Sequence, residues 1–199
     1  MTVSLVHAES SIWEARALPE HEARVAIRDI ITQLENQSSS EDPDWMTAIG
    51  YFWYLMPGNG ERINEGRRWL QRALTHAPNQ PLAHLYLAHF AYDAHEFQDA
   101  LMHLTEIPEG HYSRLGQAWR DLKIRELRLA ALITLDIPDE LETERFLADY
   151  ASADEEDRAN PDQLVAAARL AFERRGTTAL LEKIDAFAKA VGYPKSTPI

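Results

Sequence analysis

The chain has 199 residues, 45% of them hydrophobic and 26% charged, and this ordinary balance predicts a globular protein with a real core. It contains no cysteine, which excludes disulfide scaffolds, thiolate zinc sites and cysteine nucleophiles. The formal net charge of −12 disfavours nucleic acid as a partner and favours a basic protein.

The start of the chain and its apolar runs indicate neither a signal peptide nor a membrane span. The first thirteen residues lack a basic start followed by an apolar core, which argues against a signal peptide. The longest apolar run, from Tyr51 to Met56, is far shorter than the roughly 18 residues that a membrane span needs. We therefore expect a soluble, cytoplasmic protein without a membrane partner.

Apolar residues recur at helical spacing through almost the whole chain. Pro19 suits a first helical turn, and Asp42 is a capping residue in front of Pro43. Asn160-Pro161-Asp162 repeats that start, and Gly176 is a natural stop. The pattern predicts helices over about 19–34, 43–56, 61–76, 81–93, 96–106, 113–135, 138–150, 161–174 and 177–191. The tail, residues 192–199, contains two prolines and is predicted to be loose.

A small hydrophobic pattern occurs twice in the middle of the chain. Ile63, Gly66 and Leu70 are matched 34 positions later by Phe97, Ala100 and Leu104. Before each triplet, a large residue is followed by a small one, Ile49-Gly50 in the first copy and Leu87-Ala88 in the second. Small residues at these positions allow two helices to approach closely. A spacing of 34 residues is typical of repeated helix–turn–helix pairs.

The pattern resembles the tetratricopeptide repeat, with the related Sel1-like repeat as a close second. Trp53, Ala73 and Pro78 in the first copy and Leu101 in the second also match. The resemblance implies an all-α fold of antiparallel helix pairs, stacked as a short right-handed superhelix with flanking capping helices. We expect one domain over 1–191, with two repeats over 44–108 and additional helices over 113–191. The turn Pro57–Gly60 is about four residues longer than the family pattern, as in the Sel1-like variety.

In this family the first helix of each pair lines the concave, ligand-binding side. The family's grip on a peptide carboxylate uses lysine, arginine and asparagine, which are absent from the corresponding positions here. The resemblance implies instead an aromatic, mildly acidic groove for a basic or aromatic segment. The alternative is that the terminal helices cover this face and its tyrosines belong to the core. The residues predicted to line this concave groove are Asp44, Thr47, Tyr51, Tyr54, Leu55, Leu82, Leu85, His89, Tyr92 and Asp93.

The acidic residues are concentrated in one segment. Between Asp136 and Asp162 there are eleven acidic residues against two arginines. One interpretation is a solvated face that keeps the protein soluble. The other is a surface that steers a basic partner, with Asp154, Glu155, Glu156 and Asp157 as its centre.

Basic residues crowd the helix directly before this segment. Two interpretations are open: the cations pair with the following acids inside the fold, or they form a second contact site. The cations are Arg114, Arg120, Lys123, Arg125 and Arg128, and the expected buried stripe of the same helix is Leu115, Trp119, Leu122 and Leu129.

No set of residues has the spacing of an active site. His84 and His89 are five positions apart and His95 and His103 eight, whereas a metal site on one helix needs ligands three or four apart. There is no phosphate loop and no nucleophile elbow. We therefore predict no catalytic residues, no metal and no cofactor.

These observations predict a non-enzymatic protein that binds another protein. The preferred hypothesis is an inhibitor or immunity-type protein that binds one basic partner. The alternative is a general adaptor or chaperone that holds peptide segments. A helical metal-dependent enzyme is the remote alternative.

Overall fold

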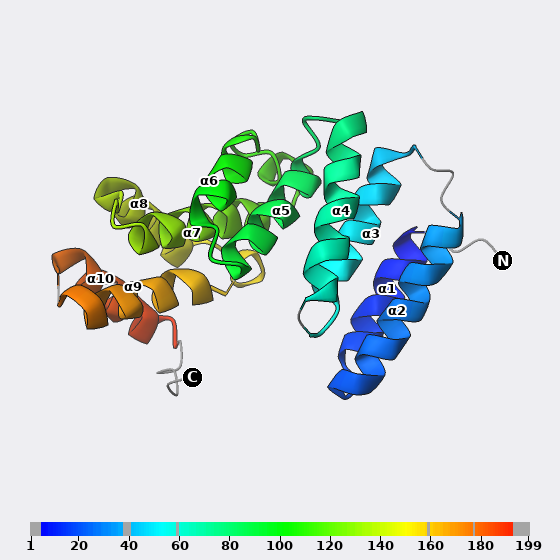
Figure 1. The fold of residues 1–199 in the computed structure, drawn as a ribbon. Helices are drawn as coiled ribbons and strands as arrows, with labels where there is room; N and C mark the ends of the chain where they lie inside the picture. Colours follow the sequence, from blue (N-terminus) through cyan, green and yellow to red (C-terminus); the bar gives the residue numbers. More distant parts are fainter. Residues whose placement is uncertain (1–4, 38–40, 59, 159, 177, 193–199) are drawn as a thin grey trace. The chain divides into compact units, whose positions relative to one another are not determined.

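The computed structural model describes residues 5–37, 41–58, 60–158, 160–176 and 178–192, and every regular element in these ranges is helical (Figure 1). The predicted all-α fold is therefore confirmed. The chain divides into two compact units, Met1–Phe90 and Ala91–Ile199, which we call the N-terminal and C-terminal units. The helices are α1 (Leu5–Arg16), α2 (Glu20–Gln37), α3 (Pro43–Leu55), α4 (Glu61–His76), α5 (Pro81–Asp93), α6 (Phe97–Thr105), η1 (Ser113–Leu115), α7 (Ala118–Thr134), α8 (Glu140–Ser152), η2 (Glu155–Asp157), α9 (Asp162–Arg175) and α10 (Ala179–Ala190).

The predicted single domain and the predicted loose tail are not tested by the described residues. One domain over residues 1–191 stays a prediction, because the two units are described separately. The loose tail over 192–199 falls outside the described residues except for Gly192. None of the helices in the described ranges combines the length and the apolar character that a membrane crossing requires.

Helix α3 begins as its sequence predicts. Asp42 accepts hydrogen bonds at its Oδ1 from the backbone N–H of Asp44, at 2.9 Å, and of Trp45, at 3.4 Å. These two bonds satisfy amide groups that have no partner within the helix. The turn after α3 contains Gly58 at φ +105°, a conformation that favours glycine.

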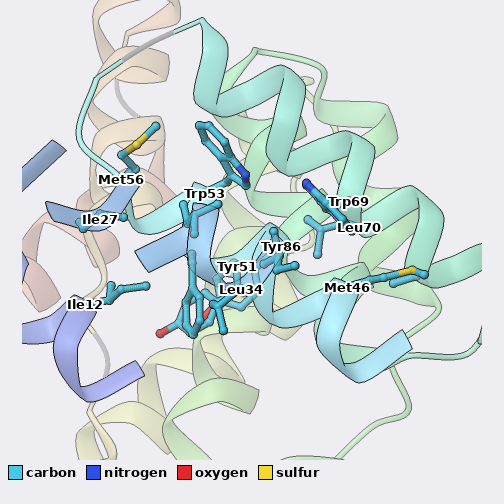
Figure 2. Packing of buried hydrophobic residues seen from close by; sticks show 14 of the residues in the cluster. Ile12, Ile27, Leu34, Met46, Tyr51, Trp53, Met56, Trp69, Leu70 and Tyr86 are labelled. Carbon is cyan, nitrogen blue, oxygen red and sulfur yellow. The ribbon is translucent and has the colours of Figure 1, made fainter. Parts of the chain in front are cut away.

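The N-terminal unit is built around one apolar core, to which α1 to α4 and the start of α5 contribute (Figure 2). Two tryptophans at its edge satisfy their polar N–H groups. The Trp69 Nε1 donates to Glu35 at 3.0 Å, and the Trp45 Nε1 donates to the Leu34 carbonyl at 3.2 Å. The large rings therefore pack without leaving a buried donor unpaired at these two positions.

The small residues of the repeat pattern permit close helix contacts, as predicted. A Cβ atom on Gly50 would lie 2.5 Å from the Cγ of Leu70, and one on Gly66 would lie 2.3 Å from the Cζ of Phe90. Carbon atoms do not approach this closely, so a larger residue would force the helices or rings apart. Gly50 therefore lets α3 approach Leu70 of α4, and Gly66 lets the Phe90 ring of α5 approach α4.

In the C-terminal unit, α7 packs against α6, α8 and α9, and α10 packs against α9. The core residues come from α7 to α10 and include the fully buried Phe146. Tyr150 contacts the edge of Phe187 with ring centroids 5.2 Å apart. Alanines occupy several core positions of α9, which lets its neighbours approach closely.

Two helix predictions need correction. Helix α1 was not predicted; its buried face consists of Ala8, Ile12 and Ala15, a stripe with only one large residue. The single helix predicted over 113–135 is wrong at its start, because Gly116 adopts a left-handed φ of +71° between η1 and α7. As a result, Leu115 and Trp119 do not join the buried stripe and are 60% and 38% exposed.

Candidate functional site

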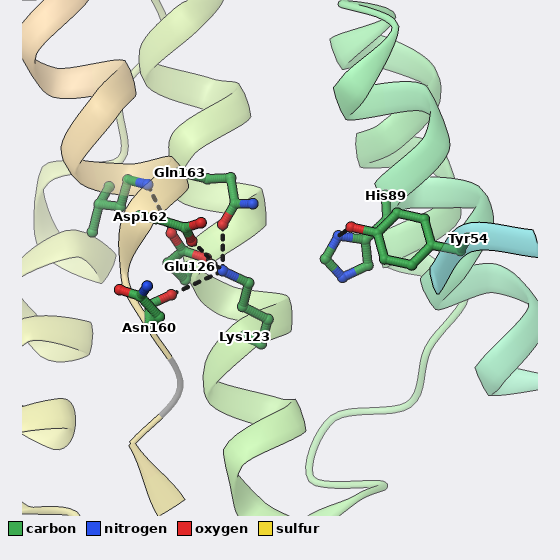
Figure 3. Close-up of polar contacts among 8 residues, drawn as sticks. Tyr54, His89, Lys123, Glu126, Asn160, Asp162 and Gln163 are labelled. Carbon is green, nitrogen blue, oxygen red and sulfur yellow. Dashed lines mark hydrogen bonds and ion pairs between the residues drawn. The ribbon is translucent and has the colours of Figure 1, made fainter. Parts of the chain in front are cut away.

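Aromatic side chains of α3 and α5 form a cluster within the N-terminal unit. Tyr51 stacks on Tyr86 with ring centroids 4.4 Å apart. The Tyr54 ring lies 5.2 Å from Tyr86, 5.2 Å from His89 and 5.3 Å from Phe90. Its Oη is 3.4 Å from the Nδ1 of His89 (Figure 3). The structure thus brings together Tyr51, Tyr54 and His89 of the predicted concave face.

The ten residues of that predicted face differ widely in exposure. The buried members hold the helices of their unit together, and a partner-binding role for the set stays a prediction. Asp44 accepts a hydrogen bond from the Gln80 amide at the start of α3. Thr47, Tyr51, Leu85 and His89 are buried, Tyr54, Leu55 and Leu82 are half-buried, and Asp44 is exposed, whereas Tyr92 (half-buried) and Asp93 (exposed) belong to the C-terminal unit.

The four acidic residues predicted to steer a partner follow α8. Asp154, Glu155 and Glu156 are exposed, Asp157 is half-buried, and none forms an ion pair with another described residue. The neighbouring Arg158 donates to the carbonyls of Ala151 and Ala153, at 3.0 and 2.9 Å. This guanidinium caps the C-terminus of α8 through backbone carbonyls and does not form an ion pair with the acidic run.

Most other acids near this run are engaged within the unit. Arg125 binds Glu142 at 2.8 Å and Asp149 at 2.7 Å, and Lys183 pairs with Glu144. The interpretation that cations of α7 pair with the acids that follow is confirmed for Arg125 and for Lys123. The negative charge of the segment is therefore least compensated at residues 154–157.

Among the described residues, the buried carboxylate Glu126 lies where α7 meets the start of α9 (Figure 3). The Glu126 Oε1 accepts the backbone N–H of Leu164 at 2.7 Å, and its Oε2 lies 2.8 Å from the Lys123 Nζ, as an ion pair outside hydrogen-bond geometry. Lys123 also donates to Asp162 at 2.7 Å, to the Asn160 carbonyl at 2.9 Å and to the Gln163 side chain. We call Lys123, Glu126 and Asp162 the buried charge cluster.

One cation serves two carboxylates in this cluster, and that imbalance shifts the ionisation of its members. Burial raises the pKa of the Glu126 carboxyl to about 7, against the opposing effect of Lys123. Burial works to lower the pKa of Lys123, but Glu126 and Asp162 outweigh it and raise that pKa. Burial, followed by the charge of Glu126, also raises the pKa of Tyr92.

The sequence prediction included Lys123 only as one of five cations and missed Glu126. A signal was present, because Glu126 falls between Leu122 and Leu129 at the spacing of one helical face. Its partners were not predictable from spacing. The Asn160 carbonyl and the Asp162 carboxylate, expected only as helix-start residues, turn out to be ligands of the Lys123 ammonium.

A second feature of the C-terminal unit is a groove of about 350 Å³ between α9 and α10, the α9–α10 groove. Val165, Ala168 and Ile184 form its apolar floor, and the Phe172 ring in its wall is 52% exposed. Charged side chains at the edge are Arg169, Glu173, Glu182 and Asp185. Such an apolar groove with a mainly acidic edge can accept an apolar anchor flanked by cations.

The histidines that crowd the middle of the chain do not converge on a metal. No group of three or more histidine and carboxylate side chains among the described residues could hold an ion. His84 lies with its Nε2 2.8 Å from the Pro78 carbonyl at the start of α5, which gives it a local structural role.

Comparisons with known proteins concern the fold. No model of a known protein family and no curated protein sequence matches the chain. The chain is similar to a crystal structure of nearly identical TPR-like repeats, a single-substitution variant of a Podosopora anserina protein described as a kinesin light chain. The two sequences are 13% identical, and the structures superpose with a TM-score of 0.51 over 98% of this chain and all of that one. A second structure of such repeats is 15% identical with a TM-score of 0.49, covering 94% and 98%. The first likeness shows that the chain has a tetratricopeptide-like helical-repeat fold.

Proposed function

We propose that this protein is a non-enzymatic interaction module that binds a basic segment of another protein in the α9–α10 groove. The observation that carries the proposal is the half-exposed Phe172 beside an apolar floor. A ring of this size exposed beside a groove is typical of a contact surface, since aromatic anchors contribute a large share of binding energy.

Charge supports a basic partner. Three carboxylates and one guanidinium line the groove, and one of the carboxylates, Asp185, pairs with Lys189. The acidic run at residues 154–157 belongs to the same unit. The C-terminal unit as a whole contains twenty-one acidic and thirteen basic residues. A field of this sign speeds the encounter with a cationic surface and repels an acidic one.

Within this class we propose an inhibitor of the immunity type, one that occupies a single basic protein. The small size and acidity of the chain favour this form, and its cysteine-free composition is compatible with the cytoplasm, which we propose as its location. The predicted residues Tyr54 and Leu55, half-buried in the N-terminal unit, remain proposed contributors to partner contact.

The experiment is affinity capture from the native host with the full chain and with two variants. Phe172→Ser removes the proposed anchor, and Met102→Ser removes an apolar side chain on α6 that is equally exposed, at 54%. We expect a basic protein to be captured by the native chain and by Met102→Ser, and capture to fall about tenfold in Phe172→Ser.

Salt supplies a second readout of the same capture. Raising the salt concentration should weaken it, because the steering charges are exposed and screened. Capture that is undiminished at high salt, or equal in the two variants, would contradict the proposal. An identified partner with an acidic surface would contradict it as well.

A further inference from the structure

The N-terminal unit contains a pocket of about 490 Å³ between the α1–α2 turn and the α3–α4 turn. Its volume lies within the range of pockets that hold small ligands. Leu18, Ala23, Leu55 and Met56 supply its apolar wall, while Arg16, Arg62 and Glu20 supply the charged groups.

Arg62 is held in a fixed orientation within this pocket. Its Nη1 donates to the Tyr54 carbonyl at 3.1 Å, and its Nε donates to the Gly58 carbonyl. The guanidinium also lies over the Tyr54 ring, 5.7 Å from its centroid. A guanidinium oriented by two carbonyls and a ring is preorganised for a planar or tetrahedral anion.

Arg16 supplies a second, more accessible cation. It is exposed, stacks on the Trp13 ring at 4.8 Å and forms no ion pair with another described residue. The carboxylate of the pocket, Glu20, is engaged by Arg24 at 3.0 Å. Arg24 in turn lies against Gly58, where an added Cβ would meet its Nη2 at 2.6 Å. Two arginines and one acid therefore line the pocket, and the acid is engaged by a third arginine outside the lining.

We propose that this pocket binds a phosphate monoester, with Arg16 and Arg62 as its ligands. A phosphate monoester carries between one and a half and two negative charges at neutral pH, in roughly the amount that two guanidiniums supply. Arginine forks bind phosphate oxygens in pairs, and the apolar wall fits the carbon portion of the ester.

The site is independent of the α9–α10 groove, since all of its residues lie in the N-terminal unit. The phosphate could belong to a free small molecule or to a phosphorylated side chain of another protein. The recognition chemistry is the same in both cases, and two arms of one titration separate them.

The test is an NMR titration of the full chain that follows the Nε–H resonances of the arginines. Inorganic phosphate, O-phosphoserine, a short phosphoserine peptide and acetate are the probes. We expect saturable shifts at Arg16 and Arg62 with phosphate and much weaker ones with acetate. Tighter binding of the peptide than of free phosphoserine would identify a protein-borne phosphate, and equal or weaker binding a small molecule.

Variants make the assignment specific. Arg16→Gln should weaken phosphate binding about tenfold, because one charge-assisted hydrogen bond is lost. Arg72→Gln is the matched control, since Arg72 stacks on the Trp69 ring at 4.6 Å outside the pocket. Arg62→Lys keeps the charge but not the fork and should also weaken binding. Equal loss in Arg16→Gln and Arg72→Gln, equal affinity for acetate, or no saturable shift would overturn the proposal.

Discussion

The two units share one architecture of helix pairs but are stabilised by different interactions. In the N-terminal unit, rings and aliphatic side chains pack against helices that approach closely at Gly50 and Gly66. In the C-terminal unit, the α7–α9 contact contains the buried charge cluster, with Glu126 only 1% exposed. A helix-pair fold therefore tolerates either kind of contact, but the two kinds of contact respond differently to substitution and to pH.

The physical difference lies in how each contact depends on its partners. Apolar packing is non-directional, so a lost methylene costs an amount that scales with the area and cavity involved. A buried carboxylate depends on specific partners, and the loss of one leaves an uncompensated charge. The C-terminal unit should therefore be the more sensitive to single polar substitutions.

The largest effect is expected at Glu126. Glu126→Ala removes the buried acceptor of the Leu164 N–H and one of the two carboxylates that bind Lys123, and should lower the free energy of unfolding by about 3–5 kcal/mol. Urea unfolding measures the loss. Glu144→Ala is the control, because Glu144 pairs with Lys183 at the surface, and it should change stability by less than about 1 kcal/mol. Equal effects would contradict a special role for the buried charge cluster.

The same residue predicts a pH dependence for the stability of the C-terminal unit. The folded-state pKa of Glu126, about 7, lies above its ordinary value of 4.5, so the folded protein binds this proton more tightly than the unfolded chain. The stabilisation from the Glu126 proton, about 3 kcal/mol for this pKa shift, is fully present below pH 4.5. It is lost as the pH rises toward 7. Unfolding of the native chain and of Glu126→Gln is compared between pH 5 and pH 8. If the two lose stability in parallel, Glu126 is not the titrating group.

A third substitution tests the packing of the N-terminal unit. Gly66→Ala places a methyl group against Phe90 and the Cβ of Trp53, and should destabilise the unit by about 1–3 kcal/mol despite the better helix propensity of alanine. Tryptophan fluorescence is a suitable readout, because four of the five tryptophans belong to this unit. Gln71→Ala, at an exposed site of the same helix, should leave the transition unchanged. A stabilised Gly66→Ala variant would show that the helices are less tightly packed than described.

The smallest effects are expected at the caps, where the two units should behave alike. Asp42 caps α3, and Asp139 caps α8 by accepting the Glu142 N–H at 2.9 Å. Replacing either by alanine should cost about 1 kcal/mol, because an orphan amide loses its acceptor. Hydrogen exchange of the first turns of α3 and α8 measures each loss locally. A much larger cost at one cap would show that its helix start also supports tertiary contacts.

The sequence predicted what depends on local spacing. The helix start at Asp42 and the close approach at Gly50 and Gly66 follow from residue type and register, and the structure confirms them. Helix α1 was missed because alanines supply most of its buried face, so its apolar periodicity is weak. The Lys123 ligands come from residues 37 to 40 positions away, and no local pattern encodes such a contact.

For the candidate surfaces too, the sequence predicted what depends on local spacing and missed what depends on contacts between distant segments. The predicted concave residues meet as a ring cluster, because helical register fixes which side chains share a face. Their burial depends on what packs over them and was left open by the sequence. The α9–α10 groove and the pocket at Arg16 and Arg62 arise from helices and turns brought together by folding. Neither could be read from spacing.

Hydrogen exchange of the full chain, with and without its captured basic partner, locates the partner-binding surface. We expect the partner to protect the amides of α9 and α10 and those of residues 154–157, while the pocket at Arg16 and Arg62 is unaffected. Protection confined to the N-terminal unit would contradict the assignment of partner binding to the α9–α10 groove.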